Sequence, residues 1–457
     1  MEAEGQSGGE TAPSWRRVIV WMTLAVVVVV GAVEAFAITS VNVRSGPSQA
    51  LGAWQQTGPG QHAGPPPLRL LAEYPASAAD NVPYDATIIL DFSSPIATHT
   101  PVPTLSPPVA GQWSRPTPTT LVFLPEGNLV PLEQITVHIP GGSAGIRSTS
   151  DATLTSSLST SFTVEDVPVL RLQQLLAELD YLPVTFTRAS PAGPTGVPST
   201  YSSPITTTAA PSDPSSALAA EPTAADAIPL SPEQGSFQWR FSNTPYQLAA
   251  QWVPGAWNVV TQGALMAFES DHGLDVDGVA GPTLWAALLQ AVAARETTSR
   301  PYTYLIATET LPETLYVWRA GEVVFQTAVN TGVEGAPTPL GTWPVYLRFT
   351  STTMKGTNPD GTKYDDPDVP WVSYFYESDA VHGFLRGAYG YPQSDGCVEL
   401  PYASAQAVFP LDTLGTLVTI TTGQLFSELG TAAPSVVVLP PLTTTTTTTT
   451  IVPEEYP

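Results

Sequence analysis

The feature that most limits what this chain can fold into is a series of short, strand-like runs separated by Pro, Gly, Asn and Ser. Between residues 68 and 165, these runs occupy positions 87–92, 120–123, 134–139 and 160–164. Their apolar residues alternate with polar ones or form short blocks, and turn-forming clusters separate the runs. Such a pattern is typical of a small antiparallel sandwich. We therefore predict a β-sandwich over residues 68–165.

A second strand-rich region extends over residues 300–422. Strand-like runs occur at 302–307, 314–318, 323–330, 345–349, 371–375 and 417–420. One helix is predicted at 402–409, where Pro401 suits the first helical turn. We expect a mostly-β domain with one main helix. Residues 355–370 hold four Asp but no His, so a solvated loop or substrate flap is favoured over a metal site.

Helical spacing appears between these two regions. Apolar residues recur at helical intervals in 169–182 and again in 262–272. Between them, residues 187–234 consist largely of Ser, Thr, Ala, Pro and Gly, a composition too poor in large apolar groups to form a core. We predict a small helical module over residues 166–296, with a disordered insertion at 187–234. The whole chain is thus multidomain and mainly β.

The N-terminal region predicts export. Residues 18–33 are apolar apart from Thr23 and follow two arginines, and Ala-Phe-Ala at 35–37 resembles a cleavage site. We favour an uncleaved single-pass anchor at 18–38, with 1–17 in the cytoplasm and the later domains outside the membrane. The alternative is a secreted protein cut near Ala37. Residues 39–67 are expected to be a linker, and 423–457 a low-complexity, Thr-rich tail.

The charge balance excludes one class of function. The formal net charge is −24, and Lys355 and Lys363 are the only lysines. No basic patch is available to neutralise phosphates, so a nucleic-acid-binding protein is excluded.

A cysteine and a histidine in the second strand-rich region are the candidate catalytic pair. Cys397 is the only cysteine, and His382, fifteen residues before it, is the only histidine after His272. An imidazole beside a thiol can take its proton and so produce a nucleophilic thiolate. Gly383 and Gly396 flank the pair and allow a substrate to approach the backbone closely. On spacing alone, a buried structural cysteine is an equal alternative.

These residues resemble the active-site motif of the L,D-transpeptidase (YkuD) family. The resemblance rests on His382-Gly383 followed by Ser-Asp-Gly-Cys-Val-Glu-Leu at 394–400, and on Thr-Pro-Leu-Gly-Thr-Trp at 338–343. The segments Leu-Gln-Gln-Leu-Leu at 172–176 and Asp-Gly-Val-Ala-Gly-Pro at 277–282 resemble the peptidoglycan-binding domain 1 family, a three-helix module. Residues 68–165 are similar to bacterial Ig-like domains through Asp-Phe-Ser-Ser-Pro at 91–95.

The resemblance implies a cysteine-dependent acyltransferase that cross-links peptidoglycan stem peptides, with no metal or organic cofactor. Cys397 would form a thioester with the donor stem, and His382 would act as general base. The Gly383 carbonyl would orient the imidazole, and the N–H groups of Gly396 and Cys397 would hold the oxyanion. Carbapenem-type inhibitors are expected to acylate Cys397. The residues expected to bind substrate are Ser394, Asp395, Gly396, Glu399, Phe384 and Tyr391.

Two positions depart from the usual family pattern. Asp395 stands where His is usual, and Glu399 stands where Arg or Asn is usual. Glu399 is expected either to favour a cationic acceptor amine or to form a salt bridge, for instance to Arg386. Two further functions therefore stay open: an L,D-carboxypeptidase of the same fold, and a non-catalytic peptidoglycan-binding envelope protein.

Overall fold

The computed structural model describes residues 66–189, 224–423 and 437–438. The predicted cytoplasmic segment 1–17, the anchor 18–38 and nearly all of the linker 39–67 lie outside these residues, as does most of the predicted tail. Among the described residues, no helix combines the length and the apolar character needed to cross a membrane.

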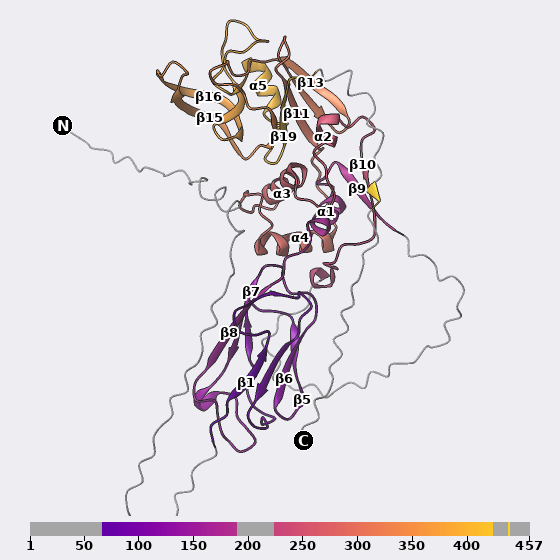
Figure 1. The fold of residues 1–457 in the computed structure, drawn as a ribbon, viewed down its shortest axis with the longest axis vertical. Helices are drawn as coiled ribbons and strands as arrows, with labels where there is room; N and C mark the ends of the chain where they lie inside the picture. The colour runs from indigo at the N-terminus through magenta and orange to yellow at the C-terminus, as the bar shows by residue number, and fades with distance from the viewer. Residues whose placement is uncertain (1–65, 190–223, 424–436, 439–457) are drawn as a thin grey trace, which may run out of the picture. The chain divides into compact units, whose positions relative to one another are not determined.

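The first described domain is a β-sandwich (Figure 1). One sheet has the order β1-β3-β6-β5 and the other β2-β8-β7-β4. All neighbouring strands in it are antiparallel except β2 and β8, which are parallel. Its elements are β1 (Leu70–Tyr74), β2 (Ala79–Val82), β3 (Ile88–Phe92), β4 (Thr104–Ser106), β5 (Gly111–Thr117), β6 (Thr120–Pro125), β7 (Gln134–Ile139), the 3₁₀ helix η3 (Gly142–Ala144) and β8 (Leu158–Val164).

The alternation in the sequence explains the core of this sandwich. In β3, Ile88, Leu90 and Phe92 are buried while the residues between them are partly exposed. Side chains on a strand point alternately to its two faces, so period-two apolar residues fill one face. The predicted runs become β3, β6, β7 and β8. Strands β2, β4 and β5 were missed because they carry few large apolar residues, and β1 was missed because its apolar residues do not alternate with polar ones.

The helical module contains α1 (Val169–Glu178), a short α2 (Tyr246–Ala249), α3 (Val259–Asp271) and α4 (Pro282–Ala294). The Asn258 side chain caps α3 by accepting a hydrogen bond from Thr261 N at 3.0 Å. Pro282 begins α4, where its fixed φ favours the helix and its missing N–H costs nothing. The predicted helices are therefore present.

The predicted insertion is too wide at both ends. Strand β9 (Val184–Arg188) pairs in antiparallel register with β10 (Gly235–Trp239), so residues 187 and 188 belong to the fold. The 3₁₀ helix η4 (Ala224–Ala227) and buried Leu230 also pack in the module. A tilted contact of Phe186 with Phe237, centroids 5.1 Å apart, helps to hold these strands together. Composition did not predict this pair of strands because its apolar residues are few and lie at the edges of the low-complexity segment.

Two residues of the predicted tail belong to the same sheet. The strand β20 (Val437–Val438) pairs in antiparallel register with β10. The low-complexity description of 423–457 therefore does not extend to these two positions.

The C-terminal domain is built from two sheets and one main helix, as the sequence predicted. The first sheet has the order β13-β12-β11-β19-β14 and the second β15-β16-β17-β18. Its elements are β11 (Thr303–Thr308), β12 (Thr314–Arg319), β13 (Glu322–Ala328), β14 (Gly341–Pro344), β15 (Leu347–Thr357), β16 (Lys363–Tyr376), β17 (Asp379–Gly383), β18 (Val398–Leu400), α5 (Tyr402–Val408) and β19 (Leu417–Thr421).

The core of this domain lies between its sheets and α5. Leu305 and Val418 of the first sheet pack in one cluster with Val381 and Val398 of the second, and Val408 of α5 joins them. Figure 1 shows α5 between the β15–β16 hairpin and the strands of the first sheet. This packing fixes β17 and β18, which carry the candidate site.

Residues 355–370, predicted to be a loop, are instead mostly strand. They form the distal part of a long β15–β16 hairpin whose turn lies around Asp360. Asp360 Oδ1 accepts from Thr362 N at 2.9 Å, which stabilises the turn. Across the strands, Lys355 Nζ lies 2.8 Å from Asp365 Oδ2. The strands were not predicted because Asp is depleted in strands. Here the aspartates lie on an exposed hairpin, where their carboxylates stay in contact with water.

Candidate active site

The two strands that carry the site are β17 and β18, which pair in parallel. Their register places His382 opposite Glu399. Cys397 comes two residues before Glu399, so the same register places it opposite Ala380. Side chains alternate between the faces of a sheet, and residues opposite each other share a face. His382 and Cys397 therefore lie on one face, on neighbouring strands and two positions apart.

The other face of these strands explains why the pair is held there. Val381 and Val398 point into the core between the sheets and are essentially fully buried. Cys397 packs instead in a small separate cluster with Ala380 and Phe384. A one-residue slip of β18 would exchange the two faces and bury the thiol in the main core. Burial of the valines thus fixes the position of the cysteine.

His382 is buried and held by a backbone carbonyl. Its side chain is 3 % exposed, and its Nδ1 lies 3.1 Å from the Gly383 carbonyl oxygen. With a proton on Nδ1 donated to that carbonyl, Nε2 is left as an acceptor. Burial lowers the pKa of the imidazole below its ordinary value, although the Gly383 carbonyl opposes this by raising it. The ring is therefore neutral at pH 7.

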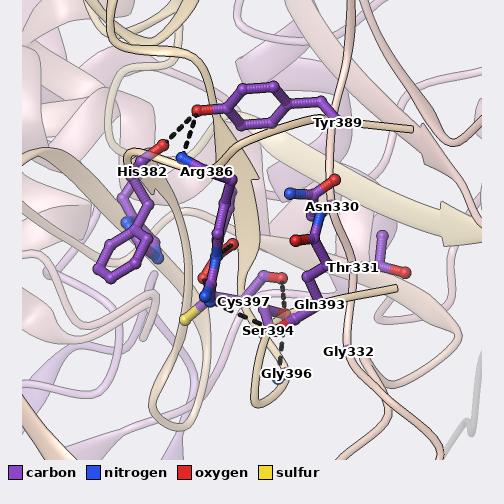
Figure 2. Close-up of polar contacts among 12 residues, drawn as sticks. Asn330, Thr331, Gly332, His382, Arg386, Tyr389, Gln393, Ser394, Gly396 and Cys397 are labelled. Carbon is purple, nitrogen blue, oxygen red and sulfur yellow. Dashed lines mark hydrogen bonds and ion pairs between the residues drawn. The ribbon is translucent and has the colours of Figure 1, made fainter. Parts of the chain in front are cut away.

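The Cys397 thiol is partly exposed and lies against the turn between β16 and β17. Its sulfur is 3.9 Å from the Ser378 carbonyl oxygen. Burial raises the pKa of Cys397 to about 12, and the carboxylates of Asp379, Glu399 and Asp395 add to this, while a backbone hydrogen bond from Ala380 opposes it. The resting thiol is therefore protonated. In the view of Figure 2, the sulfur lies on the same side of Arg386 as the His382 ring.

The segment that presents Cys397 is shaped by hydrogen bonds of its own. Ser394 Oγ donates to the Cys397 carbonyl at 2.5 Å, and Ser394 N donates to the Thr331 carbonyl at 3.0 Å. Gly396 has φ = 115°, a conformation that strains a residue with a Cβ. The Gly396 N–H, expected to hold an oxyanion, donates to Ser394 Oγ at 3.3 Å instead. Figure 2 draws the contacts of Ser394 Oγ with Cys397 and Gly396 as dashed lines.

Glu399 forms a salt bridge with Arg386. Arg386 Nε and Nη2 each lie 2.7 Å from one oxygen of its carboxylate, a bidentate pair. Glu399 is 4 % exposed. The Arg386 guanidinium also stacks 4.7 Å from the centroid of the Phe384 ring. The structure thus contains the expected salt bridge to Arg386, and direct contact of Glu399 with substrate stays a prediction.

Phe384, Tyr391 and Asp395 are the other residues expected to bind substrate. Phe384 is partly buried and meets His382 edge to face, with centroids 5.9 Å apart. Tyr391 is 43 % exposed, and the Asp395 side chain is exposed beside the cysteine segment. Phe384 belongs to the small cluster that contains Cys397, and contact of these three residues with substrate stays a prediction.

Several supporting residues carried no recognisable signal in the sequence. Glu313 is fully buried and accepts from Thr331 N and Thr331 Oγ1, both at 2.7 Å. Asn330 exchanges backbone hydrogen bonds with Glu399. Tyr389 Oη accepts from Arg386 N at 3.1 Å and donates to the Phe384 carbonyl at 2.5 Å (Figure 2). The contacts of Glu313 and Asn330 join residues far apart along the chain, so spacing in the sequence does not reveal them.

A metal site was not expected. Within residues 66–189, 224–423 and 437–438, no group of three or more His, Cys, Asp or Glu side chains is placed to hold a metal ion.

Three stretches of the chain match known families. Residues 303–420 match the YkuD family, described as the L,D-transpeptidase catalytic domain. Residues 65–164 match the bacterial Ig-like domain, and residues 246–288 match the peptidoglycan binding domain. A search of curated proteins found no match.

Solved structures with L,D-transpeptidase names are also similar to this chain. The catalytic domain of the Enterococcus faecium L,D-transpeptidase is 25 % identical, and the alignment covers 27 % of this chain and 99 % of that one, with a TM-score of 0.24. LdtMt1 in complex with imipenem is 12 % identical over 78 % of this chain and 100 % of that one, with a TM-score of 0.23. L,D-transpeptidase 3 from Mycobacterium tuberculosis, in complex with a faropenem-derived adduct, is 11 % identical over 77 % of this chain and 97 % of that one, with a TM-score of 0.24.

Because these TM-scores are low, the three domains are identified from the family matches and from the agreement of the observed folds with those families. A β-sandwich, a helical module and a mostly-β domain follow one another in the order of those matches. The chain therefore carries a bacterial Ig-like domain, a peptidoglycan-binding module and, over residues 303–420, an L,D-transpeptidase domain of the YkuD family.

Proposed function

We propose that this protein is an L,D-transpeptidase that cross-links peptidoglycan stem peptides through a thioester on Cys397. The observation that carries the proposal is the parallel register of β17 and β18, which brings the only cysteine and a buried, neutral imidazole to one face. The family match over residues 303–420 supplies the reaction class. The peptidoglycan-binding match supports the cell wall as the place of action.

The acylation step begins from a neutral thiol and a neutral imidazole. Both states follow from burial, which raises the pKa of Cys397 and lowers that of His382. A pre-formed thiolate is therefore disfavoured, and His382 Nε2 acts as a general base: it takes the thiol proton while sulfur attacks the donor carbonyl. When the tetrahedral intermediate collapses, the imidazolium gives that proton to the departing amine of the terminal D-alanine. A thioester remains on Cys397.

The second step resolves the thioester. A neutral acceptor amine attacks the thioester carbonyl, His382 takes a proton from the attacking nitrogen, and the sulfur leaves and is reprotonated. The Gly383 carbonyl, 3.1 Å from Nδ1, holds the ring in the tautomer that both steps need. The Cys397 N–H is the first proposed donor to the oxyanion. The Gly396 N–H must leave its long hydrogen bond to Ser394 Oγ before it can join.

Acylation by a β-lactam tests the catalytic role of the pair. The purified protein is incubated with imipenem, and its intact mass is measured over time. We expect one adduct per chain, no adduct in Cys397→Ala, and an adduct formed at least about 100-fold more slowly in His382→Gln. If the wild-type protein forms no adduct, the domain is not an active acyltransferase, and the non-catalytic peptidoglycan-binding alternative is favoured.

Product analysis separates the transpeptidase from the L,D-carboxypeptidase. The protein is incubated with a tetrapeptide stem, with and without a second stem that offers a free amine. A dimer that retains the donor's third residue supports cross-linking. Release of D-alanine with only a tripeptide product, even at high acceptor concentration, supports hydrolysis.

We further propose that the protein acts in the cell envelope, anchored through residues 18–38 with its later domains outside the membrane. The peptidoglycan-related matches support the envelope, and the anchor rests on the apolar run after Arg16 and Arg17. Fractionation tests this: the full-length chain should stay with membranes after a high-salt wash. A shorter, soluble product that begins near Thr39 would indicate cleavage near Ala37.

A further inference from the structure

A carboxyl group that the proposed mechanism does not use lies against the segment that carries the nucleophile. Asp379 begins β17, directly after the two-residue turn Glu377–Ser378. A Cβ built on Gly396 would lie 2.5 Å from Asp379 Oδ1 and 3.2 Å from its Oδ2. The carboxyl group therefore packs on the backbone of the residue before Cys397. The same turn contributes the carbonyl of Ser378, 3.9 Å from the sulfur.

We propose that Asp379 is a positioning residue that sets the reactivity of Cys397: its ionised form opposes thiolate and oxyanion formation, and its protonated form permits both. Two negative charges in a partly desolvated site repel each other strongly. The Gly396 bend is where the oxyanion is proposed to form, so a carboxylate packed on it opposes the developing charge in the transition state.

Among the residues that the structure describes, no cationic side chain forms an ion pair with Asp379. Glu377 precedes it on the turn, Tyr346 lies before β15, and Tyr364 belongs to β16; all three interact electrostatically with its carboxyl group. Burial, and next the charge of Glu377, raise the pKa of Asp379 to about 6. Its charge therefore changes just below neutral pH, where the Cys397 thiol is still protonated.

This inference deepens the proposed function, but its test needs only the thiol. The rate of Cys397 alkylation by iodoacetamide is measured by mass spectrometry from pH 5 to pH 9, in the wild-type protein and in Asp379→Asn. Iodoacetamide needs no stem peptide, so a failure here leaves the transpeptidase proposal untouched. The matched control is Glu377→Gln, which neutralises an exposed carboxylate on the same turn that does not contact Gly396.

The ratio of the two rate constants is the decisive quantity. At pH 5 Asp379 is protonated in the wild type, so the ratio of Asp379→Asn to wild type should be near one. Above pH 7 the ratio should reach a plateau of about 3 to 10, because removal of one like charge lowers a neighbouring pKa by about half to one unit. The rise should be centred near pH 6, the pKa of Asp379.

Several outcomes overturn the proposal. If the ratio of the alkylation rate constants of Asp379→Asn and wild type does not change with pH, the effect of Asp379 is structural and does not come from its charge. If the ratio of Glu377→Gln to wild type reaches the same plateau above pH 7, the effect comes from any negative charge on the turn and not from Asp379 in particular. If Asp379→Asn does not fold, the alkylation profile is measured in His382→Gln, which removes the other group that titrates below pH 6.5. In that variant an inflection near pH 6 in the logarithm of the rate supports the coupling, and a single straight slope from pH 5 to pH 9 contradicts it.

Discussion

The charge state of single residues decides how this site works. His382 is buried beside a carbonyl, and Cys397 is surrounded by carboxylates and apolar groups. Both groups are thereby held neutral. A cysteine enzyme can instead keep a thiolate–imidazolium pair, but that pair needs positive potential at the thiol, and here the neighbouring charges are negative. General-base activation by His382 follows from this environment.

The first prediction concerns the acidic limb of the activity profile. Burial lowers the pKa of His382, so the imidazole stays neutral as pH falls through 6.5 and is protonated only below that value. Acylation by imipenem should therefore be lost with a midpoint below pH 6.5. The profile is measured in Asp379→Asn, in which the second carboxyl group no longer titrates. A midpoint at or above 6.5 would show that the site stabilises the imidazolium.

The second prediction concerns the pair of Arg386 and Glu399. Arg386→Met leaves a carboxylate that is 4 % exposed without its cation and should lower the free energy of unfolding by about 2 kcal/mol. The double variant with Glu399→Gln should recover most of this loss, because no buried charge then remains. Urea unfolding measures both.

A matched control is available for that pair. The ion pair of Lys355 with Asp365 is exposed at both ends, by 66 % and 59 %. Lys355→Met should therefore change the stability by less than about 0.5 kcal/mol. If Lys355→Met and Arg386→Met lower the free energy of unfolding equally, burial of the carboxylate does not determine the effect of losing its cation.

Among the elements, the turn between α3 and α4 depends on a buried carboxyl group. Glu269 on α3 is 1 % exposed, and its Oε2 accepts from Gly278 N at 2.9 Å. This contact fixes the Asp-Gly turn that leads to Pro282 and the start of α4. Burial raises the pKa of Glu269 to about 7, and the hydrogen bond from Gly278 only partly opposes this.

The titration of Glu269 should make the protein less stable as pH rises. The carboxyl group binds its proton more tightly in the folded state than in the unfolded state, so its stabilising effect is present below pH 4.5 and is lost as pH rises through about 7. Glu269→Gln keeps the acceptor oxygen and removes the charge. The variant should therefore be more stable than the wild type at pH 8 by about 1–3 kcal/mol and similar at pH 4.5. Thermal unfolding at the two pH values measures the difference, and equal melting temperatures at pH 8 would contradict it.

The elements also show how far the sequence can be interpreted by itself. Runs with clear period two or helical spacing, such as β3 and α3, were found because their own residues determine burial. The distal part of the β15–β16 hairpin, residues 355–370, was missed because its stability comes from pairing across the strands, not from apolar content. At the site, His382 and Cys397 were identifiable by type and spacing. Asp379 and Glu313 were not, since only the folded chain brings them to Gly396 and Thr331.

At the scale of the whole molecule, the helical module and the C-terminal domain share one apolar core. Leu288 and Trp285 of α4 belong to the same cluster of buried residues as Tyr304 of β11 and Trp318 of β12. The Ig-like domain has a core of its own around Leu90. A shared core couples unfolding, because neither part can open without exposing the apolar surface of the other.

The last prediction uses the only cysteine as a reporter of that coupling. Leu288 and Leu90 are both fully buried, the first in the shared core and the second in the Ig-like core. Leu288→Ala should lower the free energy of unfolding by about 2–5 kcal/mol. It should also lower the urea concentration at which a maleimide rapidly labels Cys397, although Leu288 lies in another domain. Leu90→Ala removes the same group from the separate core and should leave the labelling midpoint of Cys397 unchanged. If Leu288→Ala also leaves it unchanged while the module itself is destabilised, the two domains unfold independently and the shared core does not couple them.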